Sequence, residues 1–363
     1  MKYEITKRIG SVVIAIVLFL VTWTSVFAIH DNKKMGKRDC ASKYFSVNLK
    51  TKEWRKYTSH EQMLKACDIS SSMTKEMTTD ELFNVIMEYP LLCDIFIYDS
   101  VENGIQNVRK QFRPLDELFQ RKDLPQVLLN KYKQQRIRDD IGENQQPFKK
   151  ISQTIILETL LGKKTVYNSL SNEEKKSLEI EVINKQAEKL STKMYHGTPS
   201  AKGLLSIFQK YNSSNTLDMC KASHKYVKTP KGSRVRVESF PYAGNKWSKR
   251  VTAQLKLAYP KATVLANADN RYNCHSYAWY KRSSSNRYWM NNPKKYVSDG
   301  SYRYVNKKVN KKNKIVVYGK WIHSGVVDTS GGMVRSKWGQ GPLMWHHWMY
   351  SPYSGGVKTY EKQ

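Results

Sequence analysis

The sequence predicts an α+β protein, in which a helical region precedes a region of mixed helix and antiparallel sheet. Between about residues 60 and 192, apolar residues recur at helical spacing, interrupted by Pro90, Pro114 and Pro125. From Gly232 onward the spacing changes to the alternation of strands, with one further helical stretch. Helices followed by an antiparallel meander are typical of the α+β class.

Capping signals begin two of the expected helices. Thr78 and Glu81 have the spacing of a capping box, and Ser171 and Glu174 repeat it before a long charged helix that reaches about Leu190. Between them, apolar spacing predicts helices over residues 105–112, 114–119, 125–129 and 155–160. No cluster of titratable residues in this region points to chemistry.

The second region predicts one helix and several strands. A stretch rich in Ser, Lys and Gly before Gly232 marks the boundary, and Gly331-Gly332 predicts a hairpin turn. The expected elements are a strand over 235–238, a helix over 247–259, and strands over 314–318, 322–327 and 333–338. The expected organisation is a leader 1–28, a basic lead-in 29–58, a helical domain 59–192, a linker 193–228 and a second domain 229–357.

The first 28 residues predict export. Lys2, Lys7 and Arg8 precede an apolar run from residue 9 to residue 28, which ends in a small-x-small-like cleavage signal. This pattern is typical of a signal peptide, and the bulk of the chain is expected at the cell envelope or outside the cell. The alternative is an uncleaved anchor, because about 20 apolar residues can span a bilayer and attach the protein to the membrane.

The charge balance predicts an affinity for polyanions. The chain has 62 Lys and Arg against 31 Asp and Glu, a net charge of +31. Such a protein is expected to bind anionic polymers in a salt-dependent way, and an anionic cell-wall polymer is one candidate. The alternative is a lysine-rich solvated surface with no partner. No nucleic-acid-binding motif is present, so no specific nucleic acid is expected.

The number and spacing of the five cysteines limit the redox and metal chemistry that can be expected. An odd number leaves at least one thiol unpaired or paired between molecules, and no Cys-x-x-Cys spacing suggests a metal site. No metal and no cofactor is therefore expected. The cysteines are Cys40, Cys67, Cys93, Cys220 and Cys274.

Cys274 is the candidate nucleophile. Polar residues up to Asn273 lead into an apolar helical face, which places Cys274 in the first turn of a helix. The unpaired N–H groups of a helix start favour a thiolate and can stabilise an oxyanion, so Asn273 is expected beside the oxyanion or the substrate. The alternative is a buried structural thiol.

His323 is the candidate base. It lies in an expected strand beside Ser324 and Gly325, whose small side chains leave room for substrate and for the helix of Cys274. Ser324 is a further candidate for the oxyanion or the substrate. His346 is expected to orient the base, with alternatives at Ser336, Lys337 and His347. Trp338 is expected in the core or in the wall of the substrate groove.

Three segments together resemble a group of exported bacterial domains that are distant relatives of the NlpC/P60 and CHAP peptidoglycan hydrolases. They are Tyr-Asn-Cys-His-Ser-Tyr-Ala-Trp-Tyr at 272–280, His-Ser-Gly at 323–325, and Ser-Lys-Trp-Gly at 336–339 followed by His346 and Pro352-Tyr353. The resemblance covers roughly residues 229–355. The Gly-Asp pair that usually opens the strand before the His is replaced by Asn313-Lys314.

The resemblance implies a papain-like cysteine hydrolase domain, with the Cys-bearing helix packed on an antiparallel sheet. Cys274 would be the nucleophile and His323 the base, and the substrate would be an amide or peptide bond in cell-wall peptide, with peptidoglycan as the partner. Two alternatives remain: a toxin-like hydrolase acting on another acyl group, and a non-enzymatic surface-binding module that retains the fold.

Overall fold

The computed structural model describes residues 44–136, 147–191, 204, 223–353 and 355–363. Helices and an antiparallel sheet are both present, which confirms the expected α+β class. The apolar run 9–28 and the first half of the basic lead-in (29–43), together with Cys40 and Cys220, lie outside the described residues. Within the described ranges, no helix has the length and apolar character needed to cross a membrane.

The N-terminal region is helical, as expected. The Thr78 hydroxyl accepts from the Glu81 N–H at 3.2 Å and the Glu81 carboxylate accepts from the Thr78 N–H at 2.9 Å, so the capping box forms. The described elements are η1 (Trp54–Lys56), α3 (His60–Ala66), α4 (Ser71–Glu76), α5 (Thr79–Met87), η2 (Leu92–Phe96), α6 (Val101–Gln111), α7 (Arg113–Leu118), α8 (Leu124–Gln134), α9 (Pro147–Leu161), α10 (Lys164–Asn168) and α11 (Asn172–Ser191).

The C-terminal region combines helices with two sheets. A hairpin of β1 (Ser223–Lys228) and β2 (Arg234–Ser239) begins inside the stretch expected as linker. Among the described residues, seven strands form one antiparallel sheet in the order β3-β8-β7-β6-β5-β9-β4. The remaining elements are α13 (Asn245–Ala258), β3 (Thr263–Ala266), η4 (Ser276–Tyr280), α14 (Lys295–Ser298), β4 (Tyr302–Asn306), β5 (Ile315–Tyr318), β6 (His323–Val327), β7 (Met333–Lys337), β8 (Leu343–His347) and β9 (Val357–Lys362).

The two faces of this sheet contact different helices. Residues directly opposite one another in antiparallel strands share a face, and successive residues alternate between faces. On one face, Val316 and Tyr318 of β5 join the core that contains α13. On the other face, Ile315 and Val317 join a second core that contains residues of η4. We call these the α13 face and the η4 face.

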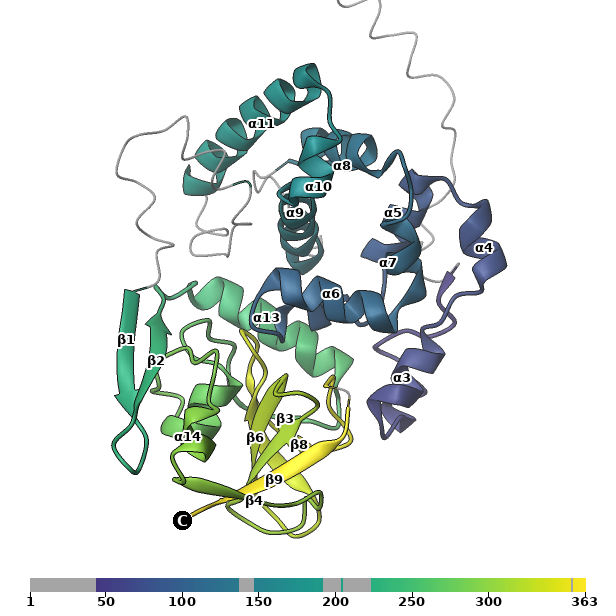
Figure 1. The fold of residues 1–363 in the computed structure, drawn as a ribbon. Coiled ribbons are helices and arrows are strands. Elements are labelled where there is room, and N and C mark those ends of the chain that lie inside the picture. The colour runs from purple at the N-terminus through teal and green to yellow at the C-terminus, as the bar shows by residue number, and fades with distance from the viewer. Residues whose placement is uncertain (1–43, 137–146, 192–203, 205–222, 354) are drawn as a thin grey trace, which may run out of the picture.

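The helical region shares its core with the α13 face. Figure 1 shows α13 running between the N-terminal helices and the sheet, and α13 contacts both η2 and α9. The indole N–H of Trp54 donates to the carbonyl of Ala258 at 2.8 Å, and the Tyr259 hydroxyl donates to Asp94 at 2.7 Å. The two regions therefore pack as one body around a continuous apolar core.

Candidate active site

Asn273 fixes the start of the helix that carries Cys274. A helical turn begins at Cys274 and continues as the π-helix η4, as expected from the polar-to-apolar transition. The Asn273 side-chain oxygen accepts from the N–H groups of Ser276 at 3.1 Å and Met290 at 3.2 Å. Its nitrogen donates to the Met290 carbonyl at 2.9 Å and to Asp99 at 3.1 Å.

These contacts correct the expected role of Asn273. A carboxamide has two N–H donors and one oxygen with two lone pairs, and the four bonds of Asn273 use all of them. It has no donor left for an oxyanion or a substrate. Its role in this conformation is to cap the Cys274 turn and to fasten it to the loop at Met290 and to the helical region at Asp99.

Cys274 is buried at the end of the sheet where β6 begins. Its side chain is 2% exposed, and this burial, reinforced by the Asp99 carboxylate, raises the pKa of the thiol. The backbone N–H groups of Ser324 and His275 act in the opposite direction, as does Lys337. Burial outweighs them, so the thiol is protonated at neutral pH in this conformation. The activation expected from a helix start is therefore not realised here.

His323 is the first residue of β6 and is wholly buried. Within the described residues, neither ring nitrogen has a hydrogen-bond partner. The ring stacks on Tyr353, with centroids 3.5 Å apart and planes at 7°. Burial, together with His346 and His275, lowers the pKa of His323 well below the usual range. A neutral, unbonded imidazole is able to accept a proton.

Ser324, the next residue, points to the opposite face. His323 lies opposite Tyr318 on the α13 face, whereas Ser324 lies opposite Val317 on the η4 face. The Ser324 hydroxyl is hydrogen-bonded to His275 Nδ1 at 2.9 Å and accepts from the indole N–H of Trp279 at 3.0 Å. Its hydroxyl therefore secures the Cys-bearing helix in this conformation.

This arrangement corrects the expected approach of the Cys-bearing helix. The helix packs on the η4 face, beside Ser324, and not on the face toward which His323 points. Among the described residues, no hydrogen bond or electrostatic interaction joins Cys274 to His323. The Cys274 sulfur interacts with the Ser324 backbone N–H. A negative charge on this sulfur would raise the pKa of Tyr353, whose ring stacks on His323.

His346 does not bond to His323. Its Nδ1 lies 2.9 Å from the His347 carbonyl oxygen and must donate, so Nε2 accepts from the Ser336 hydroxyl at 2.8 Å. Both nitrogens are occupied, and the hydrogen bond expected to orient His323 is absent. Burial lowers the pKa of His346 to about 4. Trp338 donates to Ser336 at 3.1 Å and is wholly buried, so it is a core residue and not a groove wall.

Lys337 is a buried cation near the thiol. Its amine donates to the carbonyls of Asp269 at 2.7 Å and Gly339 at 2.5 Å, and lies 4.7 Å from the centroid of the Tyr272 ring. Burial lowers the pKa of Lys337 to about 7, and the charges of Asp269 and Cys274 oppose this shift. The Ser-Lys-Trp-Gly segment thus supplies a group that titrates near neutral pH beside Cys274.

The helical region covers this end of the sheet. The Tyr353 hydroxyl donates to the Ile97 carbonyl at 2.7 Å, and the Gln340 N–H donates to the Phe96 carbonyl at 3.1 Å. Asp99 holds Asn273, and burial raises the pKa of its carboxyl. We call residues 96–99 the cover segment. Sequence reasoning missed Asp99, because it lies 174 residues before its partner and belongs to no motif.

Other candidate chemistry is sparse in the part of the chain that the structure describes. The thiols of Cys67 and Cys93 are free and buried in the helical region. Within the same residues, no three or more His, Cys, Asp or Glu side chains are grouped so as to hold a metal ion.

Comparison of this chain with protein-family models, with curated proteins and with solved structures finds no match. Any assignment of activity therefore depends on the residues themselves.

Proposed function

We propose that this protein is an exported cysteine hydrolase of papain-like type, which cleaves an amide or peptide bond in cell-wall peptide. Two observations support the proposal: Cys274 lies in the first turn of a helix, with its sulfur at the backbone N–H of Ser324, and the preceding residue, His323, has an imidazole whose two nitrogens have no hydrogen-bond partner in the described residues. Most buried polar atoms are hydrogen-bonded, so the two ring nitrogens call for an explanation, and a catalytic role is one. The π-helix that follows Cys274 supports the proposal, because such turns are frequent at functional sites.

In the proposed reaction, His323 accepts the thiol proton and the Cys274 sulfur attacks the carbonyl carbon. The backbone N–H groups of His275 and Ser324, which already interact with the sulfur, are positioned to stabilise negative charge at this end of the sheet. The protonated imidazole then donates to the leaving amine, and water hydrolyses the thioester to release the acid. No cofactor is needed to balance these steps.

The buried conformation requires that the cover segment moves before substrate binds. Cys274 and His323 are both buried, and Tyr353 and Asn273 join this end of the sheet to Ile97 and Asp99 of the helical region. The described conformation is then a latent form, in which the thiol is protonated. Withdrawal of residues 96–99 would admit water, and solvation would favour the thiolate.

A second candidate function is a non-enzymatic surface-binding module. The position of His323 on the α13 face, opposite to the Cys-bearing helix, favours it, as does the raised pKa of the Cys274 thiol. In this case Cys274 is a packing residue.

One experiment tests the hydrolase directly. Purified full-length protein is incubated with peptidoglycan, and new amino or carboxyl termini are measured by mass spectrometry. We expect release by the wild type and none by Cys274→Ser, which is nearly isosteric. Release that persists in Cys274→Ser would contradict the proposal. A reactive Cys274 without release from any wall type would favour a hydrolase that acts on another acyl group.

A further inference from the structure

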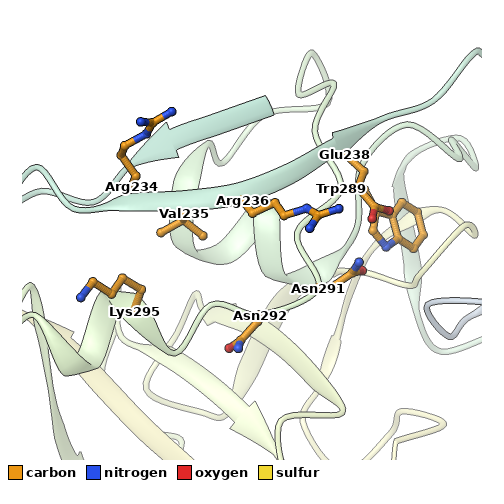
Figure 2. A pocket seen from close by; sticks show the side chains of 8 residues that line it. All are labelled: Arg234, Val235, Arg236, Glu238, Trp289, Asn291, Asn292 and Lys295. Atoms are coloured by element: carbon orange, nitrogen blue, oxygen red, sulfur yellow. The ribbon is translucent and has the colours of Figure 1, made fainter. Parts of the chain in front are cut away.

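A cavity of about 280 Å³ opens beside the β1–β2 hairpin, and Cys274 is not among the residues that line it. Glu238 of β2 and Trp289 exchange two backbone hydrogen bonds of 2.8 Å, and beyond this bridge the chain turns away from β2 toward α14. The cavity lies where the two segments separate (Figure 2). Its volume approaches the lower end of the range typical of small-molecule sites.

The lining combines cations with hydrogen-bonding groups of both kinds. Figure 2 shows Arg236 extending from β2 toward the side of Asn291, with Lys295 at the other end of the cavity. A phosphate group offers only acceptors, which match the Arg and Lys donors. The acceptor oxygens of Glu238 and of the carboxamides match hydrogen-bond donors, such as the hydroxyl groups of a polyol. The lining residues are Arg234, Val235, Arg236, Glu238, Trp289, Asn291, Asn292 and Lys295.

The surface around the cavity is basic. Its cations and aromatic rings indicate which class of phosphate polymer it suits. Exposed lysines continue the positive charge along the hairpin. The guanidinium of Arg234 lies 4.2 Å from the centroid of the Tyr226 ring, and the Lys225 amine lies 5.8 Å from that of Tyr288. A cation thus covers one face of each of these tyrosine rings, which leaves fewer faces on which nucleobases could stack, and the positive charge complements the negative charge of a phosphate polymer.

We infer that this cavity is a binding site for a polyol phosphate, such as one repeat of a phosphodiester-linked glycerol polymer. Arg236 and Lys295, at the two ends of the cavity, bind the phosphates on either side of one polyol unit, and Asn291, Asn292 and Glu238 bind its hydroxyl groups. The site uses neither Cys274 nor His323. It therefore stands or falls independently of the proposed hydrolase.

The test measures binding of fluorescent poly(glycerol phosphate) to the full-length protein by anisotropy at one fixed ionic strength. The site variant is Arg236→Gln with Lys295→Gln. Both side chains are exposed, so folding should persist and is checked by thermal unfolding. Loss of two charge-assisted bonds should weaken binding by about tenfold or more. The matched control is Lys311→Gln with Lys312→Gln, which removes the same charge from an exposed loop outside the cavity and should change binding by less than about twofold.

Two outcomes would overturn the inference. If the site variant and the control lost affinity for the polymer equally, binding would depend on the net charge of the protein and not on the cavity. Binding of single-stranded oligonucleotide, or of polyglutamate, as tightly as poly(glycerol phosphate) would contradict the polyol phosphate class. Asn292→Asp, which keeps the size of the side chain and adds a negative charge, should weaken binding as well. Cys274→Ser should bind like the wild type whether or not the hydrolase proposal holds.

Discussion

Tyr353 lies face to face with His323, at 3.5 Å between ring centroids, and its hydroxyl bonds to Ile97 of the helical region. One side chain thus covers the candidate base and ties the cover segment to the sheet. The stacked ring covers one face of the imidazole, whereas the two ring nitrogens, whose hydrogen bonds would lie in the ring plane, have no partner in the described residues. It also makes access to Cys274 depend on a region that carries no catalytic motif.

Gly339→Ala should displace the cover segment. A Cβ at Gly339 would lie 2.4 Å from the backbone carbon and oxygen of Ile97, so the cover segment must shift. We expect faster alkylation of Cys274 than in the wild type, measured with iodoacetamide and assigned by peptide mapping. Gly232→Ala is the matched control, because Gly232 also has a positive φ but no atom within 4 Å of its Cβ. Equal labelling rates in both variants would show that the segment does not control access.

Asn273→Ala should destabilise the fold substantially. The substitution removes four hydrogen bonds and leaves the Met290 N–H and C=O groups without that partner. At about 1 kcal/mol for each bond, the free energy of unfolding should fall by about 2–4 kcal/mol in urea titrations. Asn291→Ala, at an exposed position, should change it by less than about 0.5 kcal/mol. If Asn273→Ala left the free energy of unfolding unchanged, these bonds would not be formed in solution.

The histidines at the sheet predict a loss of stability in mild acid. The pKa of His346 is about 4 in the folded protein and near 6.5 when unfolded. Between these values the unfolded chain binds more protons, so stability falls as pH drops from 6.5 to 4, by up to about 1.4 kcal/mol per pH unit. His346→Asn keeps a donor for the His347 carbonyl and should reduce this slope. The slope is measured from the urea midpoints of unfolding across pH 4–7. A slope in His346→Asn equal to that of the wild type would show that His346 is not held neutral in the folded protein.

Lys337 predicts that the free energy of unfolding also rises with pH in a more alkaline range. Its pKa is about 7 in the folded protein, against roughly 10.4 when unfolded, so the unfolded chain binds more protons above pH 7. Stability should therefore rise with pH above 7, with a slope of up to about 1.4 kcal/mol per unit. Measurements between about pH 7 and 7.5 limit the opposing contribution of the unfolded thiols, whose usual pKa is about 8.5. Lys337→Met should remove this rise, whereas a slope equal to that of the wild type would place the charged amine in a solvated environment.

The sequence was most informative where the signal is local. The capping box at Thr78 and Glu81, the turn at Gly332 and the helix start at Cys274 depend on neighbouring residues, and the structure confirms each. The strand of His323 was also expected, but the face on which each side chain lies depends on the register with β5 and on which helix packs where.

Long-range partners could not be predicted. Asp99 reaches Asn273, and Ile97 reaches Tyr353, only through the packing of the helical region on the sheet. The same packing buries Cys274 and reverses the pKa shift expected from its position at a helix start. His346 appeared suited to orient His323, but Ser336 and the His347 carbonyl occupy its nitrogens, and no property of the sequence distinguishes these partners.

The most direct test of the hydrolase is the pH profile of Cys274 alkylation in Gly339→Ala, compared with the same variant carrying His323→Ala. If His323 activates the thiol once the cover segment is displaced, labelling should begin well below the usual thiol pKa of about 8.5, and His323→Ala should move the profile up toward that value. An ordinary thiol profile that does not change on replacement of His323 would contradict the account and leave Cys274 as a packing residue.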